Sequence, residues 1–138
     1  MLNSIRNIHS GRCLVQALAL GLFVAGWLHA ASKSAPVPQV NADIGPCTAD
    51  FTVRQGANQP LYNAQISVKI AYGFMGMKKM DLKIGTDSEG KARFVGLPEK
   101  VHNPPLDFVV KAKGLTKTVH FWPSAKCRAQ YAVVMGGR

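Results

Sequence analysis

Apolar and polar residues alternate along most of the chain between residues 48 and 135. The clearest case is the segment 65–72, in which Ile66, Val68 and Ile70 alternate with smaller or more polar side chains. An alternation with a period of two is typical of a β-strand that has one buried face. The same pattern predicts seven strands, at residues 48–54, 66–72, 79–84, 92–94, 106–111, 115–122 and 129–135.

The segments between the predicted strands are rich in Gly, Pro, Asn and Asp, which favour turns. Outside the N-terminal leader, no window has the i, i+3, i+4 apolar spacing of an amphipathic helix. Many short strands joined by such turns indicate an all-β sandwich or barrel. We predict that the following inward-facing residues build the core between two sheets: Ile66, Val68, Ile70, Leu82, Phe94, Phe108 and Tyr131.

Two short motifs add a family resemblance to this pattern. Residues 86–98 place a Thr-Asp-x-x-Gly turn before Phe94 and then Leu-Pro, and residues 59–64 read Gln-Pro-Leu-Tyr-Asn-Ala before Ile66. Asp87 bonds its own backbone in such a turn, and Gly90 accepts a positive φ. Together the motifs resemble the carboxypeptidase regulatory-like, or transthyretin-like, domain family. The resemblance implies a single seven-stranded Greek-key β-sandwich, transthyretin- or immunoglobulin-like, that contributes adhesive, stalk or binding modules more often than catalysis.

The N-terminal segment has the features of a secretory signal peptide. Arg6 and Arg12 precede an apolar run over residues 14–28, and small residues follow it. The alternative is a membrane anchor, but a run of about 15 residues is shorter than the roughly 20 that span a bilayer. We therefore predict a signal peptide at 1–31, a Pro/Ala/Ser-rich linker at 32–46 and a β-sandwich domain at 47–135. The protein is expected to be exported, periplasmic or extracellular, and not an integral membrane protein.

The cysteines fit an oxidising compartment. Cys13 lies in the predicted signal peptide, which leaves Cys47 and Cys127 as an even pair. Cys47 lies near the start of the first predicted strand and Cys127 just before the last. Such strands can be neighbours in a sandwich, so we predict a disulfide between them. The rival interpretation, a metal or redox site, lacks a CxxC motif and a nearby His.

The chain is basic, with a formal net charge of +10. Without residues 1–33 the net charge is still about +7, which is compatible with an anionic surface as a partner. The basic residues are spread over several predicted strands, with no run of five and no interleaved aromatic residues of the kind that stack on bases. Nucleic acid is therefore not an expected partner.

The segment 72–80, Tyr-Gly-Phe-Met-Gly-Met-Lys-Lys-Met, is unusually apolar for a hairpin turn. Exposed apolar side chains in such a place indicate a contact surface for an envelope protein or an anionic surface. An alternative is that the segment folds back and caps the open end of the sandwich. The predicted interaction surface is formed by Tyr72, Phe74, Met75, Met77, Lys78 and Lys79.

The methionines of this segment suggest a second interpretation. Met75, Met77 and Met80 have a spacing that resembles motifs of bacterial copper-handling proteins, and thioethers suit Cu(I). Against this, Lys78 and Lys79 would repel a cation, and methionine is also an adaptable packing residue. A metal site is therefore the second of the two interpretations of this segment, and we expect no cofactor.

Catalytic motifs are not recognisable in the sequence. His102 and His120 have no nucleophile or acidic residue at a recognisable spacing, so a triad cannot be argued. The transthyretin-like enzymes that open 5-hydroxyisourate end in Tyr-Arg-Gly-Ser, whereas this chain ends in Met-Gly-Gly-Arg. The sequence thus favours an exported non-catalytic binding or structural module, an accessory component of a cell-envelope complex, and not an enzyme. The alternative function is a periplasmic copper-handling module.

Overall fold

The structure of the protein, a computed structural model, describes residues 34–136, so the predicted signal peptide lies outside the described residues. The described part is almost entirely β-structure, and its only helix is the 3-10 turn η1 (Phe74–Gly76). The strands are β1 (Gln39–Asn41), β2 (Cys47–Gln55), β3 (Gln59–Pro60), β4 (Gln65–Tyr72), β5 (Lys78–Gly85), β6 (Lys91–Leu97), β7 (Leu106–Ala112), β8 (Leu115–Phe121) and β9 (Arg128–Met135).

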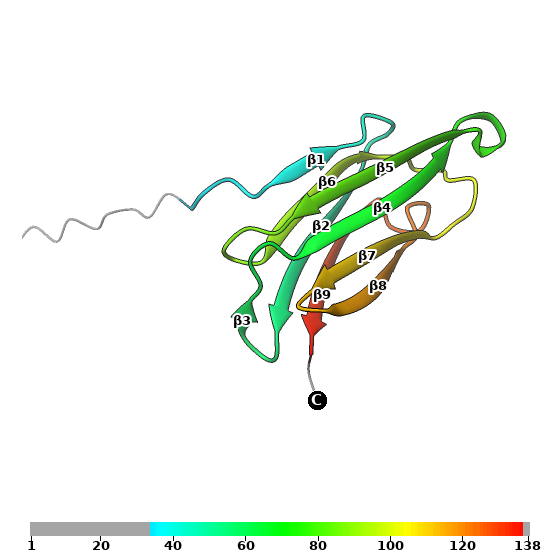
Figure 1. The fold of residues 1–138 in the computed structure, drawn as a ribbon. Coiled ribbons are helices and arrows are strands. Elements are labelled where there is room, and N and C mark those ends of the chain that lie inside the picture. The colour runs from blue at the N-terminus through cyan, green and yellow to red at the C-terminus, as the bar shows by residue number, and fades with distance from the viewer. Residues whose placement is uncertain (1–33, 137–138) are drawn as a thin grey trace, which may run out of the picture. The chain divides into compact units, whose positions relative to one another are not determined.

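The strands form two sheets that pack face to face (Figure 1). One sheet has the order β1-β6-β2-β3, with β9 also paired to β2, and the other has the order β5-β4-β7-β8. Most pairs are antiparallel, but β1 runs parallel to β6, and β9 runs parallel to β2 along the whole of β9. The predicted all-β sandwich is confirmed, and the seven longer strands are the seven that the alternation predicts.

Aromatic side chains from both sheets fill the centre of the sandwich. The ring centroids of Phe94 and Phe108, which lie on opposite sheets, are 4.9 Å apart, and Phe51 contacts both rings. Of the seven predicted core residues, five are buried. Leu82 and Tyr131 are half-buried and pack against that core.

The domain begins earlier than the sequence suggests. The segment 32–46 is predicted to be a linker, but Gln39–Asn41 form β1 and pair with β6. Ala42 is buried in the core, and the backbone N–H of Ile44 donates to the carbonyl oxygen of Gly96. Three paired residues are too short to produce a recognisable alternation, which explains why the pattern misses this strand.

The predicted turn between β5 and β6 is present with the expected chemistry. Asp87 Oδ1 accepts from the backbone N–H of Glu89 at 2.9 Å and of Lys91 at 2.8 Å. Gly90 has φ +74°, and a β-carbon there would lie 2.2 Å from the carbonyl oxygen of Val53. Glycine is therefore required both by the backbone conformation and by the close approach of β2.

The predicted disulfide is also confirmed, since Cys47 and Cys127 are bonded. It joins the first residue of β2 to the residue that precedes β9. Beside it, the backbone N–H of Thr48 donates to the carbonyl oxygen of Cys127 at 2.8 Å. The bond thus holds the two strands together where their parallel pairing begins.

Candidate functional site

The connection between β4 and β5 is a tight loop, which we call the tip and define as residues 73–77. Tyr72 at the end of β4 pairs with Lys78 at the start of β5. Between them, the backbone N–H of Gly76 donates to the carbonyl oxygen of Gly73, and that of Met77 donates to Phe74, each at 3.2 Å. Figure 1 shows this loop beyond the ends of β4 and β5.

The tip exposes three large apolar side chains: Phe74 is 81% exposed, Met75 68% and Met77 77%. Met75 also has φ +51°, in the left-handed region that is unfavourable for a side chain with a β-carbon. The tip therefore does not fold back over the open end of the sandwich, because its apolar side chains stay in solvent. Tyr72 differs from the rest of the predicted surface, since it is half-buried and packs against the core.

The loop between β6 and β7 packs against the tip. Gly76 is buried and has φ +68°, and a β-carbon on it would lie 2.9 Å from the ring of His102. The exposed residues Phe74 and Met75 thus sit on a loop that contacts a second loop. The sequence candidate His102 therefore lies against the backbone of the tip.

The charge around the tip is positive. Lys78 and Lys79 are exposed at the start of β5, and Lys100 is exposed in the loop that carries His102. Within residues 34–136, none of these three lysines forms an ion pair. Glu99 lies next to Lys100 in the same loop, so the clearest positive charge beside the apolar tip is that of Lys78 and Lys79.

The three methionines do not share one environment. Met75 and Met77 are exposed at the tip, whereas Met80 is half-buried and packs against the core. The reason is the alternation along β5, which turns Met80 toward Ile70 on the buried side of the sheet. The structure thus separates Met80, on the core side of β5, from the two exposed methionines of the tip.

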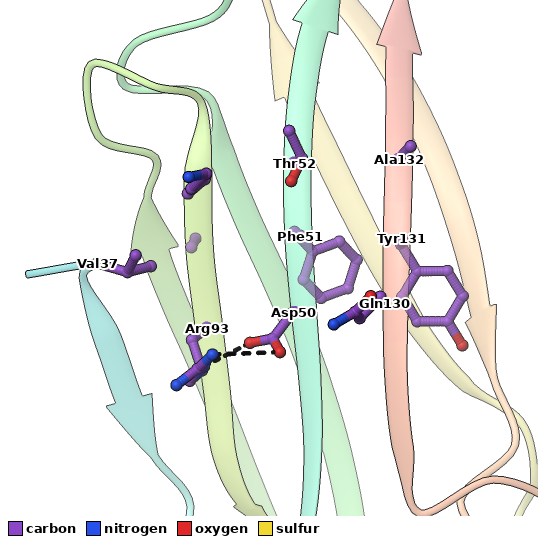
Figure 2. Close-up of a pocket in the computed structure, with 10 residues that line it drawn as sticks. Val37, Asp50, Phe51, Thr52, Arg93, Gln130, Tyr131 and Ala132 are labelled. Atoms are coloured by element: carbon purple, nitrogen blue, oxygen red, sulfur yellow. Dashed lines mark hydrogen bonds and ion pairs between the residues drawn. The ribbon is translucent and has the colours of Figure 1, made fainter.

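A second polar surface covers the outer face of the five-stranded sheet, and sequence reasoning missed it. Arg93 of β6 lies opposite Asp50 of β2, and Asp50 lies opposite Gln130 of β9. Arg93 Nε donates to Asp50 Oδ1, and this hydrogen bond to the carboxylate raises the pKa of Arg93. Figure 2 shows the three side chains next to one another, with Val37 at one side.

Two open hollows lie over this row of side chains. The first has a volume of about 550 Å³ and extends toward Thr52 and Lys91. The second has a volume of about 450 Å³ and extends toward Lys126 and Arg128. The two hollows adjoin each other across β6, β2 and β9, and together we call them the depression. The residues that line both hollows are Asp50, Arg93 and Gln130.

The other titratable candidates have local partners. His120 Nδ1 lies 2.6 Å from Asp107 Oδ1, and both side chains are exposed on neighbouring strands. The carboxylate of Asp87 is used by its own turn, and Glu89 pairs with Lys91. In the part of the chain that the structure describes, no three His, Cys, Asp or Glu side chains gather as ligands for a metal ion. The same part contains no helix of the length and apolarity needed to cross a bilayer.

Comparisons with known proteins give similarity in fold only. No family model matches the chain, and no curated protein matches it. The family resemblance stated above stays a prediction.

Several solved structures are similar. A 3-chlorocatechol 1,2-dioxygenase from Rhodococcus opacus has a TM-score of 0.45 and 15% identity over 72% of this chain and 62% of the enzyme. A mercury-inhibited catechol 1,2-dioxygenase from Acinetobacter has a TM-score of 0.43 and 14% identity over 74% of this chain and 59% of the enzyme. A 9R-lipoxygenase from Cyanothece has a TM-score of 0.40 and 15% identity over 66% of this chain and 16% of the enzyme. The chain thus spans about three fifths of the length of the two dioxygenases.

These similar structures correct one prediction. The sequence favoured a non-catalytic module and excluded enzymes, with copper handling as the alternative function. The similar solved structures are themselves named as enzymes, so the exclusion of catalysis is withdrawn. At these identities the likeness concerns the fold and assigns no reaction to this chain.

Proposed function

We propose that the tip docks the protein onto an anionic lipid surface. The observation that carries this proposal is the exposure of Phe74, Met75 and Met77 on one protruding loop. It assigns a binding surface and does not exclude catalysis elsewhere on the domain.

The shape and chemistry of the tip favour a bilayer as the occupant. A short protruding loop with apolar side chains has no groove that could enclose a peptide, but it can enter the boundary between lipid headgroups and acyl chains. Each of its three large side chains contributes at most about 1.5–3 kcal/mol when fully buried. Partial insertion therefore yields weak, reversible binding rather than permanent anchoring.

The lysines around the tip favour anionic lipid over neutral lipid. A Lys near an anionic surface contributes about 1 kcal/mol, and Lys78 and Lys79 directly follow the tip, whereas the charge of Lys100 in the neighbouring loop is offset by Glu99 beside it. Their contribution depends on ionic strength, because exposed charges are screened by salt. Binding should therefore weaken as salt is raised, while the apolar part remains.

The disulfide supports the proposal that the protein works in an oxidising compartment. Bonds such as Cys47–Cys127 persist mainly in oxidising compartments, including the bacterial periplasm and the extracellular space. We therefore propose that the protein is exported and binds the lipid there. N-terminal sequencing of the exported protein, with a first residue between Ala31 and Pro36, would test this part separately.

The direct test is sedimentation with vesicles. The wild-type protein should bind phosphatidylglycerol vesicles and bind phosphatidylcholine vesicles much more weakly. The double variant Phe74→Ser, Met75→Ser should lose about tenfold or more in affinity, because it removes most of the inserted apolar surface. Tyr62→Ser is the matched control, since Tyr62 is 75% exposed but precedes β4, at the end opposite the tip.

Four results would overturn the proposal. One is equal binding by the double variant and the wild type. Another is an equal loss in the Tyr62→Ser control, which would indicate general surface hydrophobicity. The third is a large fall in thermal stability of the double variant, which would place Phe74 and Met75 in the core. Binding to a protein of the envelope without binding to vesicles would identify a protein partner instead.

A further inference from the structure

The depression on the outer face of the five-stranded sheet has the composition of a binding site for a polar anion. Its cations come from separate strands: Lys91 and Arg93 lie on β6, and Arg128 lies on β9. Lys126 and Arg128 are exposed and form no ion pair within residues 34–136. Arg93 is paired with Asp50 and Lys91 with Glu89, so the uncompensated positive charge of the depression comes from Lys126 and Arg128. A concave place concentrates such charge and attracts anions more strongly than a flat surface.

The centre of the depression adds hydrogen-bonding groups of both kinds. Arg93 has five N–H donors and uses two of its nitrogens toward Asp50, which leaves donors for another carboxylate. Asp50 is an acceptor, and Gln130 next to it is both a donor and an acceptor. A ligand that fits must therefore carry anionic groups for the cations and hydroxyl groups for Asp50.

This mixture distinguishes the depression from the tip. The exposed large apolar residues include Phe74, Met75 and Met77 of the tip, but none of them lines either hollow. The apolar residues that line the hollows, such as Val37 and Ala132, are small or partly buried, so a lipid surface finds no large exposed apolar side chain here.

Single-stranded nucleic acid is also disfavoured, because stacking on exposed aromatic side chains contributes much of its affinity. The aromatic residues that line the hollows are Phe51, which is buried, and Tyr131, which is half-buried and packs against the core. A polyanion without hydroxyl groups would in addition be repelled by the Asp50 carboxylate.

We infer that this depression binds a soluble acidic oligosaccharide, a chain of sugars that carries both carboxylates and hydroxyl groups. The register places the groups in successive rows across the strands: Lys91 lies beside Thr52, and one row further Arg93 lies beside Asp50 and Gln130. Side chains on one face of a strand are about 6.7 Å apart, and neighbouring strands are about 4.8 Å apart. Together with hollows of about 550 and 450 Å³, this spacing accommodates a short oligomer rather than a single small ion.

Calorimetric titration with an oligogalacturonate tests the inference. The control ligand is a maltooligosaccharide of the same number of sugars, which has the hydroxyl groups without the carboxylates. The full chain should bind the acidic oligomer and not the neutral one. Arg93→Gln and Arg128→Gln should each raise the Kd about tenfold, the loss expected for one charge-assisted contact.

Two variants serve as controls. Lys83→Gln removes an exposed cation from β5, on the other sheet, and should leave the Kd unchanged. Arg93→Gln leaves Asp50 without its partner, so its folding must be checked by thermal unfolding, whereas Arg128→Gln removes no ion pair and tests the site without that complication. Phe74→Ser with Met75→Ser should keep oligosaccharide binding, which separates this site from the proposed lipid contact.

The inference is wrong if the folded protein does not bind oligogalacturonate, or if it binds the neutral oligomer equally well. An equal loss of affinity in Lys83→Gln would show that binding depends only on the net charge of the protein. Tight binding of single-stranded DNA that Arg93→Gln and Arg128→Gln both abolish would also overturn it, because the depression would then be a nucleic-acid site.

Discussion

Gly76 lies against the imidazole ring of His102, so the tip rests on the loop between β6 and β7. Two loops that are distant in sequence therefore act as one unit at this end of the sandwich. The contact explains how the short loop holds Phe74 and Met75 in solvent, where neither side chain packs on the core.

This contact predicts a specific effect of Gly76→Ala. The new β-carbon would lie 2.9 Å from the His102 ring at a position with φ +68°, so the tip must shift. Gly114→Ala is the matched control, because Gly114 has φ +74° and nothing within 4 Å of the added carbon. Both variants should lose about 1–2 kcal/mol for the backbone conformation, but only Gly76→Ala should also weaken vesicle binding. Equal vesicle binding by the two variants would show that the His102 support does not position the tip.

Thr86 should be sensitive to loss of its hydroxyl. The side chain is 3% exposed, its Oγ1 donates to the carbonyl oxygen of Leu61, and the backbone N–H of Ala64 donates to Oγ1 at 2.9 Å. Thr86→Val keeps the shape but leaves two backbone groups without a partner, which should cost about 1–3 kcal/mol. Denaturant unfolding measures the loss, and Thr86→Ser should retain most of the stability. A Val variant as stable as the wild type would mean that water satisfies both groups.

Phe94 should be a major contributor to the free energy of unfolding. It is fully buried between the sheets and contacts Phe51 and Phe108. Phe94→Ala is expected to lower the free energy of unfolding by about 3–5 kcal/mol, because it leaves a cavity in a packed core. Phe74→Ala, at an exposed site, should change it by no more than about 0.5 kcal/mol. Urea denaturation of both variants tests the contrast, and a loss below about 1 kcal/mol in Phe94→Ala would contradict the core assignment.

Reduction of Cys47–Cys127 should destabilise the domain by about 2–4 kcal/mol. The bond closes a sequence separation of 80 residues, so its loss gives the unfolded chain more conformational freedom. Mass spectrometry of a non-reduced digest should show the linked peptides, and urea titrations with and without reductant should show the shift. Two free thiols in the exported protein would contradict the bond.

Tyr131 should make stability decrease at high pH. Burial raises its pKa, and its hydroxyl donates to the carbonyl oxygen of His120 at 3.2 Å. The folded state therefore favours the protonated phenol, and this stabilising contribution is complete below the ordinary tyrosine pKa of about 10 and is lost as the pH rises through the raised value. The free energy of unfolding should fall more steeply above about pH 10 in the wild type than in Tyr131→Phe. Lys91, whose pKa Glu89 raises by a hydrogen bond, is common to both proteins and cancels in the comparison. Equal slopes would show that the phenol titrates as it does in solvent.

The alternation of side chains was sufficient to locate the long strands and part of the core. It identifies which face of a strand is buried, as for Ile66, Val68 and Ile70, because neighbouring side chains on a strand point to opposite sides. The turn at Asp87 and Gly90 and the bond between Cys47 and Cys127 were predicted as well, since each depends on chemistry that the residues carry with them. The exposed apolar tip could be found for the same reason, although half-buried Tyr72 shows that alternation does not settle the exposure of a strand end.

The sequence by itself therefore determined the class of fold, the seven longer strands and the cysteine pair. Only the tertiary structure decided which strands are neighbours, and with that the second surface. Asp50 lies beside Arg93 and Gln130 because β2 lies between β6 and β9. Gly76 contacts His102 because the β4–β5 and β6–β7 loops lie at the same end of the sandwich. Alternation does not encode such pairings, since every strand presents similar backbone groups to any partner. The choice among partners is made by the packing of the whole core and the geometry of the connections, which no single segment contains.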